Sequence, residues 1–187
     1  MSWCVLNTDA PYVMKVDDDT YVNIPYLVRQ LRLGNQPVIS QILESQGDAR
    51  NYIMGAVVID SAVVRDEEDK WFLSQLEYPS DYFPTYTSGN GYVMTRSAMK
   101  KILAASFKTD MINLEDVFIT GILAREAQVT LVSHPGFSYW TSTSSTACDM
   151  ITGKRITSAN LTIKQFNSLY ANINTILRTG NMTECVK

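Results

Sequence analysis

Cysteine, histidine and clustered positive charge are all scarce in this 187-residue sequence. It contains three cysteines and one histidine, and 16 Lys and Arg against 19 Asp and Glu give a net charge of −3 without a long basic run. That balance argues against a protein that binds nucleic acid or an anionic membrane surface. No apolar stretch approaches the roughly 18 residues of a membrane-spanning helix. Residues 1–12 also lack the basic region and apolar block of a signal peptide.

Apolar and aromatic residues, in contrast, are plentiful. Hydrophobic residues make up 45% of the sequence, with six Phe, ten Tyr and three Trp, which is more than a disordered chain carries. A prior of one domain per ~150 residues predicts one domain over residues 1–187. The sequence as given therefore predicts a soluble globular unit with a buried core.

Cysteine spacing and two glycosylation sequons bear on the compartment. Cys4, Cys148 and Cys185 are too few and too scattered for a disulfide scaffold or a CxxC metal site. Any two of them could form one disulfide and leave the third as a free thiol. Asn160 and Asn181 open sequons, although chance yields about one in a chain of this length. Together these features favour a secretory lumen, which requires a targeting segment outside this sequence.

Hydrophobic patterns predict alternating strands and helices. Strands are expected at residues 12–16, 52–59, 92–94 and 129–132, and helices at residues 24–33, 96–107, 115–127 and 163–177. Residues 78–86 are expected to form an irregular aromatic loop, residues 88–91 a tight turn, and Asn160 the cap of the last helix. The alternation predicts an α/β sandwich with a mainly parallel sheet.

The first candidate site is an acidic triplet, Asp17, Asp18 and Asp19, at the end of an apolar strand. Adjacent carboxylates repel one another, and a divalent cation such as Mg²⁺ or Mn²⁺ would remove that repulsion. In an extended segment Asp17 and Asp19 point the same way. A solvated acidic loop is the alternative, and the spacing does not fit an EF-hand.

Two further candidates carry groups able to exchange a proton or bind a metal. Glu115 and Asp116 open a predicted helix, where the helix dipole keeps a carboxylate charged and able to act as a base. Simple capping of that helix is the alternative. His134 follows a predicted strand, and it is either a ligand or a packed histidine.

The fourth candidate is the aromatic loop with its glycines. Tyr86 and its aromatic neighbours offer flat rings for the C–H face of a sugar, and Gly89 and Gly91 allow a ligand to approach the backbone. A loop that covers the core with half-buried tyrosines is the alternative explanation.

Taken in order, these segments resemble the β-1,3-galactosyltransferase family, also known as glycosyltransferase family 31. Residues 12–23 are similar to its KxDDDxFVN segment, residues 65–71 to RD…KW, residues 82–94 to YPxYxSGxGYVLS, and residues 115–121 to EDVYxG. Residues 134–137 lie where members often carry a His before Gly-Phe. Four blocks in the same order are far more specific than any one of them.

The resemblance implies a GT-A-like, Rossmann-like glycosyltransferase sandwich and an inverting, metal-dependent hexosyltransferase. Galactose, or N-acetylglucosamine, would pass from a UDP-sugar to an oligosaccharide or glycoconjugate acceptor in β-1,3 linkage. Asp19 maps onto the strongest ligand of Mn²⁺ (or Mg²⁺), with Asp17 and His134 as further candidates. Asp116 maps onto the catalytic base.

The remaining site residues follow from the same blocks. The resemblance places Trp71, Tyr86 and Tyr92 around the sugars. Among the substrate-binding residues it also includes Asp18, Gly89, Gly91 and Glu115.

Members of the family carry a cytoplasmic tail, a membrane anchor, a stem and the first nucleotide-binding strands before the triplet, and they reside in the Golgi membrane as type II proteins. None of these segments is in this sequence, so residues 1–187 are expected to form a partial catalytic domain that reaches the membrane only through an absent anchor. Many members have a Cys where Thr87 stands and another within residues 121–123. A catalytically inactive glycan-binding domain is the competing interpretation, and the intact acidic residues favour the enzyme.

Overall fold

The structure, a computed structural model, describes residues 1–32, 50–139 and 144–185. Its strands are β1 (Tyr12–Val16), β2 (Tyr21–Val22), β3 (Tyr52–Val58), β4 (Tyr86–Thr95), β5 (Thr130–Ser133) and β6 (Thr157–Ser158). Its α-helices are α1 (Ser2–Asn7), α2 (Ile24–Arg32), α4 (Arg96–Ser106), α5 (Ala124–Glu126), α6 (Ala147–Ile151) and α7 (Ile163–Thr179). A π-helix, η1 (Val117–Leu123), precedes α5, and a 3-10 turn, η2 (Thr183–Cys185), lies near the C-terminus. None of the helices in these residues is long and apolar enough to cross a membrane.

The main sheet has the strand order β1-β4-β3-β5. β4 runs antiparallel to both β1 and β3, and only the β3–β5 pair of this sheet is parallel. The α/β class is confirmed, but the expectation of a mainly parallel sheet is wrong. The chain between β3 and β4 is an irregular loop, and antiparallel partners need no crossover helix.

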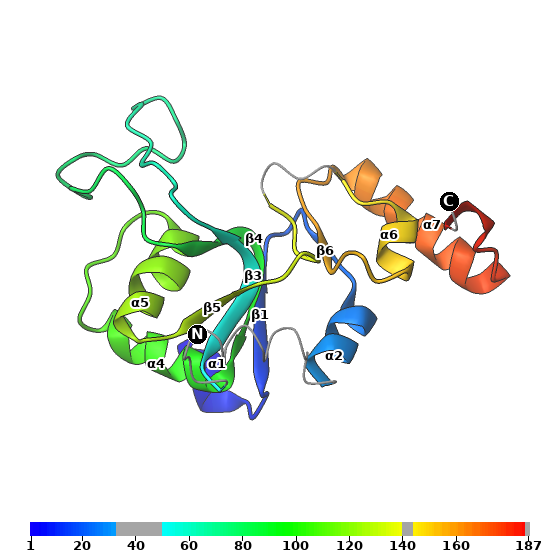
Figure 1. Cartoon of the computed structure of the whole chain (residues 1–187), viewed down its shortest axis with the longest axis horizontal. Helices are drawn as coiled ribbons and strands as arrows, with labels where there is room; N and C mark the ends of the chain where they lie inside the picture. Colours follow the sequence, from blue (N-terminus) through cyan, green and yellow to red (C-terminus); the bar gives the residue numbers. More distant parts are fainter. Residues whose placement is uncertain (33–49, 140–143, 186–187) are drawn as a thin grey trace.

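Alternating residues of β3 face two separate cores. Ile53 packs with Met99 and Ile102 of α4 and with Phe118 and Leu123 of η1. On the other face, residues 52, 54 and 56 pack against Leu27 of α2 and against Ile156 of the C-terminal segment, residues 144–185. Figure 1 accordingly shows α4 and α5 on one side of the sheet and α2 on the other. The sheet is therefore covered by helices on both faces.

Strand β4 is longer than expected, because residues 88–91 belong to it and do not form the predicted tight turn. Its glycines serve close packing. A Cβ on Gly89 would lie 3.1 Å from Asp116 Oδ2, and one on Gly91 would lie 3.4 Å from both Met14 and Thr157. The aromatic loop that precedes β4 is irregular as expected.

The predicted helix over residues 115–127 is confirmed in position but not in type. Residues 115 and 116 are helical, η1 follows at Val117, and the chain returns to α-geometry only in α5. The Thr120 side chain accepts the Thr87 N–H at 2.8 Å and donates to the Asp116 carbonyl at 2.6 Å. Thr120 therefore joins η1 to the start of β4.

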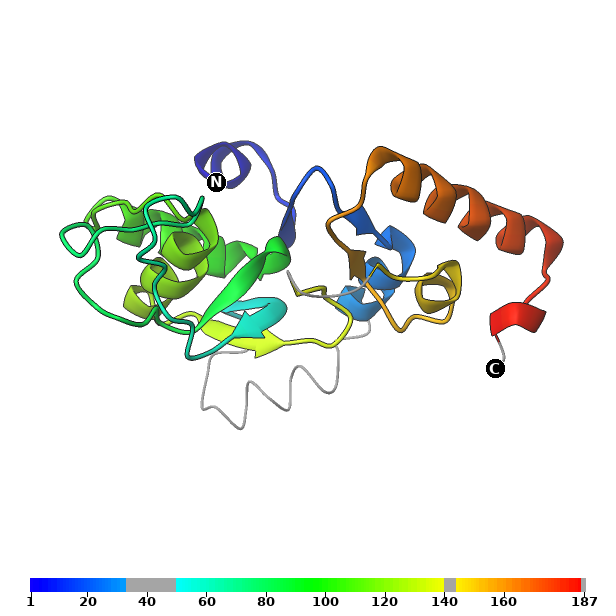
Figure 2. The same cartoon turned by 90° about the horizontal axis from the view of Figure 1, so that it is seen from above.

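The C-terminal segment forms a second layer beside α2. β6 pairs with β2, and Figures 1 and 2 both place α6 and α7 beyond the sheet on the α2 side. Thr162 caps α7 through a capping box with Gln165, whereas Asn160 is an exposed residue with φ 56°, so the predicted cap was wrong. The buried face of α7 consists of Leu169 and Ile173 with Phe166. Spacings of three and four in the sequence also predict Ile163, Tyr170 and Leu177 on this face, but all three are exposed.

A disulfide joins Cys148 of α6 to Cys185 of η2, which leaves Cys4 free. It closes a 37-residue separation, and such a crosslink stabilises a fold mainly by constraining the unfolded chain, here by about 3–4 kcal/mol. We expect reduction with dithiothreitol to lower the free energy of unfolding in urea by that amount. A Cys4→Ser variant, which keeps the bridge, should respond identically. The same unfolding midpoint with and without dithiothreitol would contradict the Cys148–Cys185 disulfide.

Candidate active site

The acidic triplet lies where β1 leaves the sheet. The Asp17 N–H donates to the Asn90 carbonyl at 3.4 Å, and the Asp19 carbonyl accepts the Leu161 N–H at 3.0 Å. The main chain of the triplet is thus tied to β4 at one end and to the C-terminal segment at the other. Asp18 is exposed, and Asp19 is half-buried with a contact of 3.3 Å from the Thr20 hydroxyl to its carboxylate.

Asp116 is half-buried, and both of its carboxylate oxygens accept backbone N–H groups. Oδ1 accepts from Val117 and Oδ2 from Gly89, each at 2.9 Å. Burial raises the pKa of Asp116; the two N–H groups oppose this, Glu115 adds to it, and Lys15 opposes it, so the net pKa is higher than usual. An ionised carboxylate in this position is a stronger base than an exposed aspartate.

Glu115, next in sequence, is held differently. Its Oε1 accepts the Tyr92 hydroxyl at 2.5 Å, and its Oε2 lies 3.1 Å from the Lys15 ammonium. Tyr92 is 1% exposed, and burial, followed by the nearby Glu115 charge, raises the pKa of its hydroxyl, so it stays a neutral donor. All four carboxylate oxygens are therefore engaged, but by different partners. Neutral backbone N–H groups hold Asp116, whereas Glu115 is held by the Tyr92 hydroxyl and paired with the charged Lys15 ammonium.

Lys15 joins the acidic triplet to this helix start. Its ammonium lies 2.6 Å from Asp17 Oδ1 as well as 3.1 Å from Glu115 Oε2. Burial alone lowers the pKa of Lys15, but its hydrogen bonds and charge interactions with Asp17 and Glu115 outweigh burial and raise it. Lys15 was not among the predicted site residues, although it is the lysine of the KxDDDxFVN-like segment. Its position two residues before Asp17, on the same side of an extended strand, was the signal that could have found it.

His134 lies at the end of β5, where its Nδ1 accepts the Gly136 N–H at 3.0 Å and its ring packs edge-on against Phe137. Burial lowers the pKa of His134, so the ring is neutral at physiological pH. A neutral imidazole that accepts at Nδ1 carries its proton on Nε2. In this state the side chain holds the turn after β5.

The predicted metal ligands Asp17, Asp19 and His134 do not lie together as a three-residue metal site in the described part of the chain. Within residues 1–32, 50–139 and 144–185, no group of three His, Cys, Asp or Glu side chains is close enough to hold a metal ion. Mg²⁺-type sites are nevertheless often formed by one or two carboxylates together with substrate phosphates. The oxygen donors of Asp17 and Asp19 fit such a cation, and their assignment stays a prediction.

The aromatic candidates lie in different settings. Trp71 is 43% exposed on the loop before β4, with the Lys70 ammonium 4.2 Å from its ring centroid. Tyr86 is half-buried and packs edge-on against Phe83 in a small apolar cluster. Tyr92 lies in the main core, where its hydroxyl positions Glu115. Of these three rings, Trp71 is therefore the most exposed.

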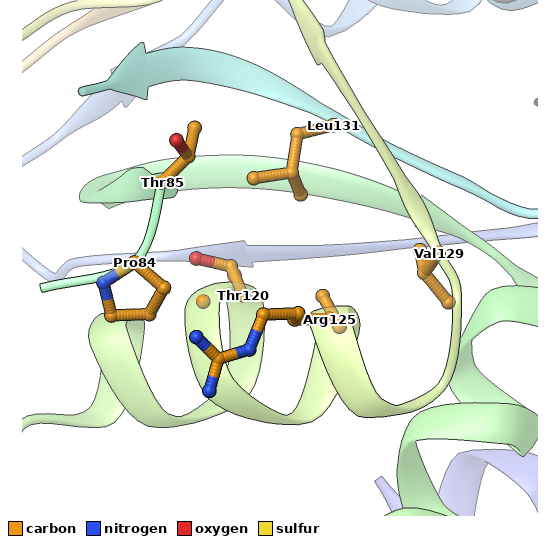
Figure 3. A pocket seen from close by; sticks show the side chains of 8 residues that line it. Pro84, Thr85, Thr120, Arg125, Val129 and Leu131 are labelled. Atoms are coloured by element: carbon orange, nitrogen blue, oxygen red, sulfur yellow. The ribbon is translucent and has the colours of Figure 1, made fainter. Parts of the chain in front are cut away.

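Two hollows lie near these groups. One, of about 350 Å³, is lined by Asp18 and Asp19 and by four residues of the C-terminal segment: Leu161, Ile163, Phe166 and Asn167. The other, of about 390 Å³, is shown in Figure 3 between Pro84, Thr85 and Leu131 and the helix that carries Thr120 and Arg125. None of the predicted site residues lines the second hollow, so the first is the one that belongs to the acidic site.

Fold and site together define a mixed α/β protein with carboxylates gathered where β1 and β4 meet a helix start. The galactosyltransferase family model matches residues 1–135. Beta-1,3-galactosyltransferase 2 of Mus musculus is 32% identical over 134 residues, which are 70% of this chain and 29% of that protein. Beta-1,3-galactosyltransferase 1 of Homo sapiens is 30% identical over 131 residues, which are 70% of this chain and 36% of that protein.

The chain therefore belongs to the galactosyltransferase family, a family of glycosyltransferases. It spans 29% to 36% of the length of these two curated relatives. The family match ends at residue 135, so it includes β1 to β5 and the acidic residues but not α6, β6 or α7. The C-terminal wall of the acidic hollow lies outside the matched range.

Proposed function

We propose that the full-length protein is an inverting hexosyltransferase of the GT-A fold class that acts in the lumen of the Golgi apparatus. It transfers galactose or N-acetylglucosamine from a UDP-sugar to a glycan acceptor in β-1,3 linkage. Family membership supports glycosyl transfer in general. The observation that carries the mechanism is the Asp116 carboxylate, half-buried and fixed by the Gly89 and Val117 N–H groups.

In this mechanism Asp116 takes the proton of the acceptor hydroxyl as that oxygen attacks the anomeric carbon from the face opposite the leaving group. The bond between the anomeric carbon and the phosphate oxygen breaks, UDP leaves, and the configuration inverts. Asp116 receives only the proton, so no covalent sugar–enzyme intermediate forms.

Asp19, with Asp17, would hold Mn²⁺ or Mg²⁺ at the end of β1. A bound cation neutralises charge that develops on the leaving diphosphate. Both residues would offer carboxylate oxygens, which are the ligands such cations prefer. Asp18 and the 350 Å³ hollow beside it offer hydrogen-bond acceptors and an apolar wall to a sugar.

An assay of UDP release tests the proposal. The full-length protein is given UDP-galactose or UDP-N-acetylglucosamine, with Mn²⁺ and a panel of glycan acceptors. We expect release that depends on the acceptor with at least one donor. Binding of glycans without turnover of either donor would instead support the glycan-binding interpretation.

The pH dependence of the reaction follows from the environment of Asp116. The base must be ionised, so kcat/KM falls as the pH drops through the Asp116 pKa. Because burial raises this pKa, we expect the fall of kcat/KM at low pH to begin above pH ~4, the ordinary pKa of an aspartate side chain. The measurement is a profile of log kcat/KM against pH. A rate that stays constant down to pH ~4 would contradict this environment for the base.

A further inference from the structure

Lys15 lies where three segments of the site meet. Its Nζ is 2.6 Å from Asp17 Oδ1, 2.6 Å from the Gly89 carbonyl oxygen and 3.1 Å from Glu115 Oε2. A lysine ammonium has three protons to donate, so these three acceptors use all of them. The three acceptors come from the triplet after β1, from β4 and from the helix start before η1.

Gly89 extends this connection to the base. Its carbonyl accepts from Lys15, and its N–H donates to Asp116 Oδ2 at 2.9 Å. A Cβ at this position would be 3.1 Å from the same oxygen, so glycine allows the strand to lie against the carboxylate. Tyr92 completes the arrangement by holding the second oxygen of Glu115. Lys15 is therefore linked to Asp17 directly and to Asp116 through one residue.

The ion pairs of Lys15 are too exposed to stabilise the fold strongly. The side chains of Lys15, Asp17 and Glu115 are 33%, 41% and 44% exposed. Pairs in such positions contribute little to the free energy of unfolding, because water screens their attraction. What the three contacts fix is the relative placement of the segments that carry Asp17 and Asp116.

We propose that Lys15 is a positioning residue for glycosyl transfer, holding the acidic triplet and the base-bearing helix start in one arrangement. This inference rests on the proposed function. Lys15 acts through Asp17, Gly89 and Glu115 and does not touch the reacting atoms. Its removal should leave the fold in place while the groups that act on the leaving diphosphate and on the attacking hydroxyl lose their common geometry.

The test compares Lys15→Met with wild type in the full-length protein. We expect kcat to fall by roughly 10–100-fold, since a displacement near 1 Å costs about that much. KM for the UDP-sugar and the melting temperature should change little. Lys108→Met, an exposed lysine after α4, is the matched control and should behave as wild type. A wild-type kcat in Lys15→Met would overturn the proposal.

Lys15→Arg separates position from charge. Arginine keeps the positive charge, but its planar guanidinium cannot serve three converging acceptors as an ammonium does. We expect it to recover only part of the lost kcat. Full recovery would show that charge alone suffices, and would overturn a role that depends on fixed geometry.

Hydrogen exchange gives a readout that does not require activity. In Lys15→Met, the Gly89 and Val117 amides, which donate to Asp116, should lose protection, whereas the amides of α7 should not change. Unchanged exchange at both amides would overturn the proposal even if the wild type transferred no sugar. Wild-type inactivity with every donor would count against the proposed function alone.

Discussion

Asp116→Asn in the full-length protein is expected to lower kcat by roughly 10²–10⁴-fold, the usual contribution of a positioned general base. Asparagine has nearly the same size but accepts no proton from an attacking hydroxyl. It offers one acceptor oxygen where the carboxylate serves both the Gly89 and Val117 N–H groups. One of these N–H groups therefore loses its partner, which costs about 1–2 kcal/mol of unfolding free energy.

Steady-state kinetics and urea unfolding, measured on the same preparation, separate this account from simple helix capping. If Asp116 only caps the helix start, Asp116→Asn should show a small loss of stability and near-normal turnover. Glu115→Gln is the matched control, because Glu115 is engaged by Tyr92 and Lys15 and should matter less for kcat. A near wild-type kcat in Asp116→Asn would remove Asp116 from the mechanism and move the base to Glu115.

Asp19→Ala is expected to lower the transfer rate by about 10³-fold or more, since loss of a cation that stabilises the leaving group is worth several kcal/mol. The fold should tolerate the change. The main-chain carbonyl of Asp19, which accepts the Leu161 N–H, is retained, and the carboxylate contact with Thr20 is long at 3.3 Å. Chelation of divalent cations should abolish wild-type transfer in the same assay.

Asp110→Ala is the control for this experiment, because Asp110 is an exposed carboxylate outside the site. It should retain wild-type activity and the same dependence on added Mn²⁺. Isothermal titration calorimetry with Mn²⁺ measures the cation affinity of the metal-free Asp19→Ala and Asp110→Ala variants directly. Transfer at the wild-type rate without any divalent cation would contradict the metal assignment of Asp19.

The positions of most elements could be predicted from the sequence, because burial imposes a period on the side chains. The expected strands at residues 12–16 and 52–59 agree with β1 and β3 within one residue. Strand direction could not be predicted, because no local pattern records whether a long irregular loop returns the chain parallel or antiparallel. Only the second part of β4 was predicted, at residues 92–94. Residues 88–91 were expected to form a turn because of their glycines, which instead allow close packing against Asp116 and Met14.

For the site, the sequence indicated which residues carry chemistry but not how they are held. The acidic triplet and the Glu115–Asp116 pair are conspicuous as clustered charges, and the structure places both beside β4. The role of Tyr92 as a buried donor to Glu115 depends on a contact across 23 residues of sequence. Lys15 likewise bonds Gly89, which is 74 residues away, and no spacing rule predicts such a contact.

Nuclear magnetic resonance of the reaction product tests most directly whether the protein transfers a sugar with inversion of configuration. The full-length protein is incubated with Mn²⁺, a glycan acceptor and UDP-galactose or UDP-N-acetylglucosamine, whose sugars are α-linked, and the anomeric configuration of the new bond is determined. We expect a β-linkage, because Asp116 activates the acceptor hydroxyl for one displacement with inversion. An α-linked product, or no product with either donor, would contradict it.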